Sequence, residues 1–253
     1  MTGTSVERPV VCITQARINS TRLPAKVLLP IAGKPLLWWH LERLKRSRRI
    51  HRIVVATTGE AAADAIVEIA EQAGVLVFRG SEDDVLDRFA GAAALAAAAT
   101  VVRVTSDCPV IDPALIDRTI AFYESAGPDC HYASVDVGTF PRGLDCEVFS
   151  RQSLDEAQRE AVASDDREHV TPFIRRHTGR YRARFLSTVP GDPVYRWCVD
   201  TQADFDLVRR IIEHFAPTGL DFSWTDIAML MRAHPDWAAI NAHVVQKPVG
   251  GSP

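Results

Sequence analysis

The first 125 residues or so alternate between short apolar runs and longer stretches with helical periodicity. The stretches place apolar residues three or four positions apart, which is the spacing of one buried helix face. The short runs, rich in Val and Ile and typical of buried strands, are Val10–Ile13, Arg52–Thr57, Val75–Phe78 and Val101–Thr105. Strand and helix in alternation predict right-handed βαβ units. We therefore expect an α/β fold built on a parallel sheet.

From Cys130 onward, short strands are mixed with helices. Strands are predicted at 131–135, 144–149, 183–187 and 197–200, and helices at 151–161, 167–177, 203–215 and 225–234. Because no long linker interrupts the chain, we expect a single Rossmann-like domain over residues 8–240, with a mostly parallel central sheet flanked by helices. Its parts are 8–126, a smaller mixed lobe at 127–200, and C-terminal helices at 201–240. Residues 1–7 and 241–253 are predicted to be flexible tails.

Composition excludes several classes of protein. A formal net charge of -3, from 29 basic and 32 acidic residues, gives no general affinity for nucleic acid or anionic membranes. The chain has no apolar run of about 18 residues and no signal-like N-terminus, so we expect a cytoplasmic protein without membrane contact. Five scattered cysteines without a CxxC pair argue against a disulfide framework or a zinc site. A reactive role for Cys108 stays open.

A strongly basic loop follows the first predicted strand. It carries Arg17, Arg22 and Lys26, and no Asp or Glu occurs from residue 8 to residue 41. Such cations on a surface loop can simply be solvated. This loop, however, lies at the carboxyl end of a strand, where open α/β sheets bind ligands. Guanidinium and ammonium groups bind phosphoryl oxygens with strong charge-assisted hydrogen bonds, so a polyphosphate is the predicted ligand.

Two aspartates follow predicted strands. Asp107 comes after VVRVTS, and Asp200 comes after YRWCV. If the fold brings them together, they can hold a hard divalent cation such as Mg²⁺. Read alone, Asp200 is equally well explained as the N-cap of the helix that follows it. Together with the basic loop, the two carboxylates predict a nucleoside triphosphate site with a bound Mg²⁺, in which catalysis works mainly by positioning and charge neutralisation.

These residues resemble a known family. The chain looks like the cytidylyltransferases that include CMP-Kdo synthetase, and most closely like the spore-coat-polysaccharide-type branch. The resemblance spans about Val10 to Phe215 and is specific because its patches fall in the family's order. The patches are Ala16-Arg17, Ser20 to Pro24 with Lys26, Gly33 to Leu36, Gly80 to Arg88, Ser106 to Pro109, Pro141 to Asp145 with Glu147, Arg167 to Pro172, and Val199 to Thr201.

The resemblance implies an enzyme, usually a homodimer, that joins CMP from CTP to a small anionic acceptor and releases pyrophosphate. Residues 8–126 would bind the nucleotide, and 127–200 would bind the acceptor and form the dimer. The implied nucleotide site consists of Ala16, Arg17, Arg22, Lys26, Arg88, Thr105 and Asp107. Of these, Arg17, Lys26 and Asp107 would be catalytic, and Asp107 and Asp200 would hold Mg²⁺.

The implied acceptor site consists of Arg142, Asp145, His169 and Arg175. For His169, packing of a helix-face histidine against the sheet is an equal alternative. The acceptor can be a sugar acid, a phosphate or a phosphonate. The family often has glycine where this chain has Asn19 and Ala25. Asn tolerates the left-handed region, whereas Ala25 is expected to tighten or shift the triphosphate loop.

Two other functions compete with this interpretation. A metal-dependent nucleotide-sugar glycosyltransferase would place a DxD-type acidic pair after the fourth strand, where this chain has the single acid Asp107. A nucleotide sensor would bind CTP without turnover. Retention of the loop cations and of both aspartates favours the enzyme.

Overall fold

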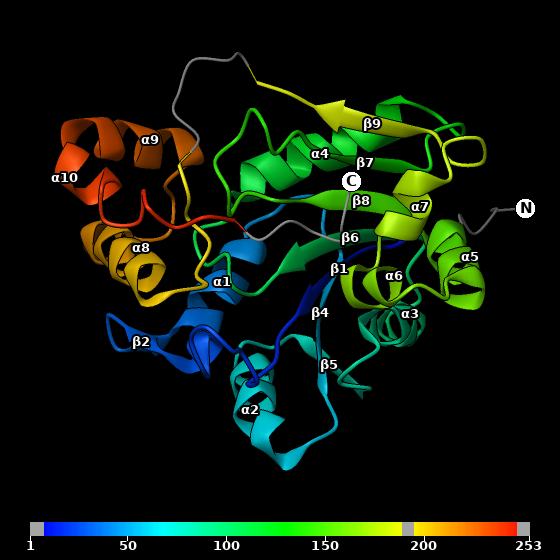
Figure 1. Cartoon of the computed structure of the whole chain (residues 1–253), viewed down its shortest axis with the longest axis horizontal. Helices are drawn as coiled ribbons and strands as arrows, with labels where there is room; N and C mark the ends of the chain where they lie inside the picture. Colours follow the sequence, from blue (N-terminus) through cyan, green and yellow to red (C-terminus); the bar gives the residue numbers. More distant parts are fainter. Residues whose placement is uncertain (1–7, 189–194, 247–253) are drawn as a thin grey trace, which may run out of the picture.

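A central sheet of seven strands organises the part of the chain that the structure describes (Figure 1). The computed structural model describes residues 8–188 and 195–246. The strand order is β5-β4-β1-β6-β8-β7-β9, and within it β8 runs antiparallel to both neighbours while the other pairs are parallel. The strands are β1 (Val10–Gln15), β4 (Arg52–Thr58), β5 (Leu76–Gly80), β6 (Thr100–Thr105), β7 (Tyr132–Val135), β8 (Glu147–Ser150) and β9 (Ala183–Leu186). A separate hairpin pairs β2 (Pro30–Ile31) with β3 (Lys34–Pro35).

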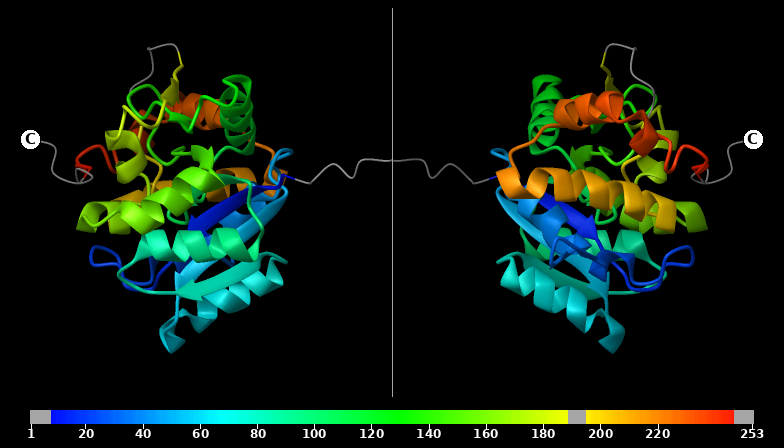
Figure 2. Two further views of the ribbon diagram at one scale, coloured as in Figure 1. Left: turned by 90° about the vertical axis from the view of Figure 1, so that its right-hand side faces the viewer. Right: turned by 90° about the vertical axis from the view of Figure 1, so that its left-hand side faces the viewer.

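Helices cover both faces of the sheet (Figure 2). One face packs against α1 (Leu36–Leu44), α2 (Asp64–Gln72), α4 (Pro113–Ser125), α8 (Gln202–Phe215), α9 (Trp224–Ala233) and α10 (Pro235–Ala238). The other packs against α3 (Val85–Leu95), α5 (Arg151–Glu160), α6 (Ser164–His169) and α7 (Pro172–Arg176). Strand alternation separates the two cores, because Cys12 of β1 lies in the first cluster while Val11 and Ile13 lie in the second. Short 3₁₀ turns occur at η1 (Lys26–Leu28), η2 (Ala61–Ala63) and η3 (Ala216–Thr218).

The winding of the chain reverses between β1 and β6. From β1 the chain moves through α1 and α2 toward β5, and α3 then returns it across the opposite face to β6. Such a reversal leaves a crevice beyond the carboxyl ends of the two strands, where ligands bind in open parallel sheets. Gln15 and Thr105, the last residues of β1 and β6, are paired in register at this point of reversal. The fold therefore places the basic loop and the Asp107 turn side by side.

The α/β fold with a mostly parallel sheet is confirmed, and the four strands predicted in the first part of the chain are all present. The mixed strands of the second part extend the same sheet. Helix ends were predicted less well. The helix expected at 167–177 is split into α6 and α7, because Val170 has a φ of 71° and Pro172 starts a new helix. None of the helices within the described ranges is long and apolar enough to cross a membrane.

The strand predicted at 197–200 is absent. Residues there are extended, but they bond to loops: the Trp197 amide donates to the Arg142 carbonyl at 2.7 Å, and the Val199 amide donates to the Asp107 carbonyl at 2.8 Å. These backbone amides therefore bond to loop carbonyls and not to a neighbouring strand. The prediction of a flexible tail from residue 241 is also wrong at its start, because Asn241 is buried; residues 1–7 and 247–253 lie outside the described ranges.

Candidate functional site

Three side chains from distant parts of the sequence meet at the carboxyl edge of the sheet. Lys26, the first residue of η1, donates from Nζ to Asp107 Oδ2 at 2.8 Å and to Asp200 Oδ1 at 2.9 Å. The same ammonium donates to the Val199 carbonyl at 2.7 Å. The structure thus brings together the basic loop and both predicted metal-binding carboxylates.

The turn after β6 fixes Asp107. Thr105 donates from its hydroxyl to Asp107 Oδ1 at 2.6 Å. Burial alone raises the pKa of Asp107, but the Lys26 ammonium and the hydrogen bonds from Lys26 and Thr105 outweigh it and hold that pKa well below its usual range. Burial opposes the charged form of Lys26 as well, yet the two carboxylates raise its pKa above the ordinary value. Lys26 and Asp107 are therefore both charged at neutral pH.

Behind this turn lies a buried histidine. His40 of α1 donates from Nδ1 to the Cys108 carbonyl at 2.9 Å, so its Nε2 accepts from the Thr14 hydroxyl at 3.0 Å. Burial lowers the pKa of His40 to about 4. Cys108 is itself buried, and burial raises the pKa of its thiol well above the ordinary value. A protonated, enclosed thiol is a poor nucleophile, which argues against a reactive role for Cys108.

Asp200 is held by a second group of charges. Arg22 Nη2 lies 3.0 Å and Arg196 Nη2 2.6 Å from Asp200 Oδ2. Arg196 also donates from Nε to Asp204 Oδ1 at 2.9 Å. Thr201 and Asp204 form the capping box of α8, so the alternative prediction that Asp200 is the N-cap is wrong. Asp200 therefore does not cap this helix, and its side chain contacts Lys26.

The C-terminal segment reinforces this arrangement. Asn241 donates from Nδ2 to the Arg196 carbonyl at 2.9 Å and to Asp204 Oδ1 at 2.8 Å. Because Arg196 and Asp204 are buried, their charges need these partners. The sequence did not point to Arg196 or Asn241, because these two residues are 45 positions apart and only the fold brings them together.

The basic loop is closed by its own backbone. The Ala25 amide donates to the Ile18 carbonyl at 3.0 Å, and Ala25 has a φ of 51°. Ala25 thus takes the left-handed conformation that glycine would take, so the loop keeps a glycine-like path at this residue. Asn19 does not use the left-handed region; its side chain donates to Glu82 Oε1 at 2.7 Å.

Arg17 and Arg88 lie apart from the Lys26 contacts. Arg17 is about half exposed, with Glu168 as an ion-pair partner at 4.0 Å. Arg88 is buried and donates from Nη1 to the carbonyls of Ser81 and, at 2.8 Å, Glu82. Burial lowers the pKa of Arg88. Arg88 therefore braces the loop before α3, and Ala16 at the end of β1 is buried against the core.

The predicted acceptor residues form two groups. Arg142 Nη1 pairs with Asp145 Oδ1 at 2.8 Å, so these two members of the predicted acceptor site contact each other. Arg142 also bonds through its backbone to the segment that carries Asp200. His169 ends α6, where burial lowers its pKa, and Arg175 lies on α7 with an exposed side chain. No contact joins the two groups among the described interactions.

A buried carboxylate was missed as a site element. Glu147 accepts from the hydroxyls of Tyr132 and Thr171, both at 2.6 Å, and pairs with Arg103. Burial raises the pKa of Glu147, but Arg103 and these hydrogen bonds bring it below its usual value. A glutamate inside the apolar run CEVF was the available signal.

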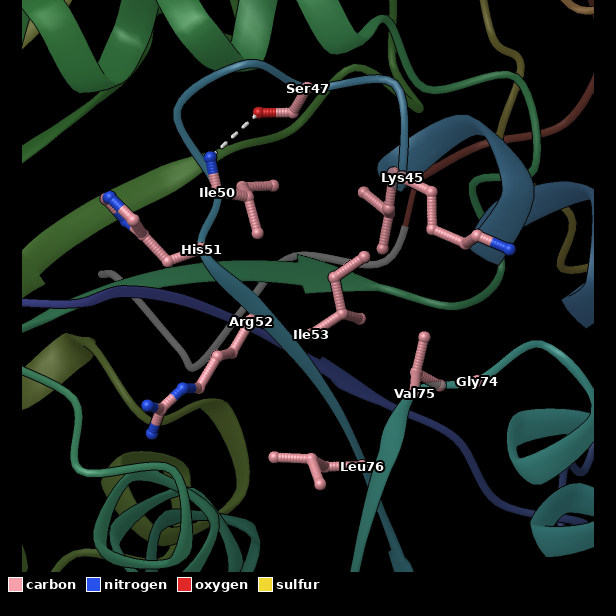
Figure 3. A pocket seen from close by; sticks show the side chains of 10 residues that line it. Lys45, Ser47, Ile50, His51, Arg52, Ile53, Gly74, Val75 and Leu76 are labelled. Carbon is pink, nitrogen blue, oxygen red and sulfur yellow. Dashed lines mark hydrogen bonds between the residues drawn. The ribbon is translucent and has the colours of Figure 1, made fainter.

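A cavity of about 440 Å³ lies at the opposite edge of the sheet, at the amino ends of β4 and β5 (Figure 3). Its polar side chains already have partners. Lys45 donates to Glu42 Oε1 at 2.7 Å, Arg52 donates to the Ala96 carbonyl at 2.8 Å, and His51 accepts from a backbone amide at 3.1 Å. The cavity is therefore unrelated to the charged residues described above.

The residues that could hold a divalent cation at this site are two carboxylates, those of Asp107 and Asp200. Among the described residues, no group of three or more His, Cys, Asp or Glu could hold a metal ion. Asp107 and Asp200 nonetheless converge on one cation, the Lys26 ammonium. Two carboxylates with the remaining ligands from phosphate oxygens and water are how Mg²⁺ is usually bound beside nucleotides.

A mostly parallel α/β sheet with cations and paired carboxylates at its carboxyl edge is the arrangement expected of a nucleotidyltransferase. The comparison with protein families gives the same class and refines it. The sequence profile described as "Cytidylyltransferase" matches residues 11–215. The chain belongs to the cytidylyltransferase family.

Individual relatives agree with this assignment. The spore coat polysaccharide biosynthesis protein SpsF of Bacillus subtilis (strain 168) is 32% identical over 90% of this chain and 96% of its own length. The 3-deoxy-manno-octulosonate cytidylyltransferase of Pseudomonas fluorescens is 40% identical over 69% of this chain and 75% of its own. A solved cytidylyltransferase from Leptospira borgpetersenii superposes with a TM-score of 0.88 at 30% identity, covering 95% of this chain and all of that one.

Proposed function

We propose that this enzyme transfers CMP from CTP to a small anionic acceptor and releases pyrophosphate. The observation that carries the proposal is the meeting of Lys26, Asp107 and Asp200 at one point. In this proposal Arg17, Arg22 and Lys26 bind the phosphates, while Asp107 and Asp200 hold Mg²⁺. Bound there, Mg²⁺ would neutralise charge on the phosphates and polarise the P–O bonds.

The nucleoside part of CTP would bind beside the ends of β1 and β6. Ala16 and Thr105 lie at these strand ends, and Arg88 would act near the cytidine through the loop that it braces. Lys26 and Arg17 would act as catalytic residues by stabilising charge on the transferred and departing phosphates.

The reaction asks little acid–base chemistry of the protein. An oxygen of the acceptor attacks the α phosphorus in line, a new P–O bond forms, and the bond to the bridging oxygen breaks. Pyrophosphate leaves with that electron pair. A phosphate or phosphonate acceptor attacks through an oxygen that is already ionised, whereas the attacking hydroxyl of a sugar acid loses its proton to solvent as the new bond forms. The chain's task is therefore to align the two anions and offset their repulsion.

The acceptor would bind near Arg142 and Asp145, with His169 and Arg175 as a second group. The names of the relatives, one acting on a sugar acid and one in spore coat polysaccharide biosynthesis, favour a sugar acid over a phosphate or phosphonate. We also propose that the enzyme is a homodimer and that it acts in the cytoplasm. Light scattering of the purified protein would test the dimer.

A pyrophosphate-release screen tests the proposed reaction. Each nucleoside triphosphate is combined with Mg²⁺ and a panel of sugar acids, sugar phosphates and phosphonates. CTP with one anionic acceptor should release pyrophosphate. Asp107→Asn should reduce the rate by a factor of about a hundred or more, because it removes charge at the metal. Asp129→Asn, a change at an exposed ion pair with Arg182, is the matched control and should leave the rate unchanged. Equal rates for both variants would refute the assignment of Asp107.

A further inference from the structure

We infer that the Lys26 ammonium and the divalent cation occupy the same position in turn, so that a metal ion binds tightly only together with a nucleotide. The inference rests on the proposed function and concerns the regulation of the same site. It comes from the contacts of the Lys26 side chain, which bonds to the carboxylate oxygens that a metal ion would need.

The ammonium of Lys26 is fully engaged. It has three donors, and its three acceptors, on Asp107, Val199 and Asp200, lie between 2.7 and 2.9 Å away. The side chain is only 12% exposed. A magnesium ion binds oxygens at about 2.1 Å, so it cannot share Asp107 Oδ2 and Asp200 Oδ1 with an ammonium already placed between them. The two cations therefore exclude each other.

Arg22 adds to this competition, whereas Arg196 does not. Arg22 also lies on Asp200, but its side chain is 30% exposed and no second carboxylate holds it among the described ion pairs. Arg196 is anchored by Asp204 and stays in place when Asp200 changes partner. Two of the three cations of the basic loop, Lys26 and Arg22, thus contact the carboxylates that would hold the metal, and Arg22 is the more exposed of the two.

A triphosphate supplies what the exchange requires. When Lys26 and Arg22 turn to phosphate oxygens, Asp107 and Asp200 lose their counterions and take the metal, so charge is balanced at every position. Without a nucleotide, a metal ion would have to displace a buried, fully hydrogen-bonded ammonium that has no new anionic partner. Metal and nucleotide must then strengthen each other's binding by the same factor.

The test measures Mn²⁺ binding by electron paramagnetic resonance in the full chain, without nucleotide. Wild type should bind Mn²⁺ weakly. Lys26→Met, which keeps the length of the side chain but removes the charge, should bind it about tenfold more tightly or better, within the usual range of coupling between sites. Lys26→Arg should remain weak because it keeps a cation between the carboxylates. Lys45→Met, far from the site, is the matched control and should behave as wild type.

A second readout is thermal stability. Mn²⁺ alone should raise the melting temperature of Lys26→Met and leave that of wild type unchanged, because only a cation bound to the folded state stabilises it. Tight Mn²⁺ binding by wild type without nucleotide overturns the inference whether or not Lys26→Met folds. So does a folded Lys26→Met that gains no affinity.

The outcomes separate this inference from the proposed function. If wild type releases pyrophosphate from CTP but the affinity for Mn²⁺ does not change with the charge at Lys26, the proposed exchange is wrong and the proposed reaction is unaffected. If no triphosphate yields pyrophosphate with any acceptor of the panel, the proposed function fails by itself.

Discussion

His40 should make the stability of this enzyme depend on pH between about 4 and 6.5. Burial lowers the pKa of His40 from 6.5 to about 4. In that window the unfolded chain carries a proton that the folded chain does not, so stability is complete above pH 6.5 and falls as the pH drops toward 4. At about 1.4 kcal/mol per pH unit, the expected loss of unfolding free energy is about 3 kcal/mol.

The structure explains why protonation is costly. The ring of His40 is completely buried, so a proton would place a charge away from water, and the Thr14 hydroxyl that donates to Nε2 would have to turn round and accept. The Nδ1 side holds the Cys108 carbonyl in the turn that carries Asp107. Because Nδ1 donates in the neutral and in the protonated ring alike, this contact does not itself change with pH, and burial is the cause of the expected acid loss.

Urea unfolding at pH values between 4.5 and 7.5 measures this effect. In His40→Asn, the amide nitrogen takes the place of Nδ1 and cannot gain a proton. The variant should be less stable at neutral pH by about 1–3 kcal/mol, because the Thr14 hydroxyl loses its acceptor. Its stability should, however, vary much less with pH than that of wild type. Equal pH dependence in the two proteins would show that another group causes the acid loss.

Four further predictions concern single positions. Arg142→Ala should raise the KM of the acceptor far more than that of CTP in steady-state assays, and an equal rise in both would show that Arg142 serves neither substrate specifically. Gly143→Ala should destabilise the fold by about 1–3 kcal/mol in urea titration, since its φ is 101° and an added Cβ would lie 2.6 Å from the carbonyl carbon of Trp197. Ala25→Gly should be neutral or stabilise by up to about 1 kcal/mol, because relief of the left-handed strain exceeds the added chain entropy; a loss above that size would contradict it. Arg196→Lys should cost about 1–3 kcal/mol, because an ammonium lacks the planar fork with which the guanidinium reaches Asp204 through Nε and Asp200 through Nη2, and an unchanged urea midpoint would argue against a structural role.

Part of the site could be predicted from the sequence, and part could not. A basic loop and an aspartate placed after apolar strands were enough to predict that Lys26 and Asp107 lie at one edge of the sheet, because parallel strands end at one edge. The ion pair between Arg142 and Asp145 was not predicted, since it depends on a turn at Gly143 that the residue types do not fix. The pairing of Glu147 with Arg103 joins β8 to β6 and follows from sheet register alone.

By itself, the sequence determined the alternation of strands and helices, the apolar faces that form two cores, and the clustering of positive charge after the first strand. These follow from local periodicity and composition, which need no knowledge of distant contacts. Only the tertiary structure decided which charges pair: that Lys26 lies between Asp107 and Asp200, and that Thr201 rather than Asp200 caps α8. The reason is physical. An ion pair depends on distances of a few ångströms between residues far apart in the chain, and those distances exist only after the sheet and its helices have packed.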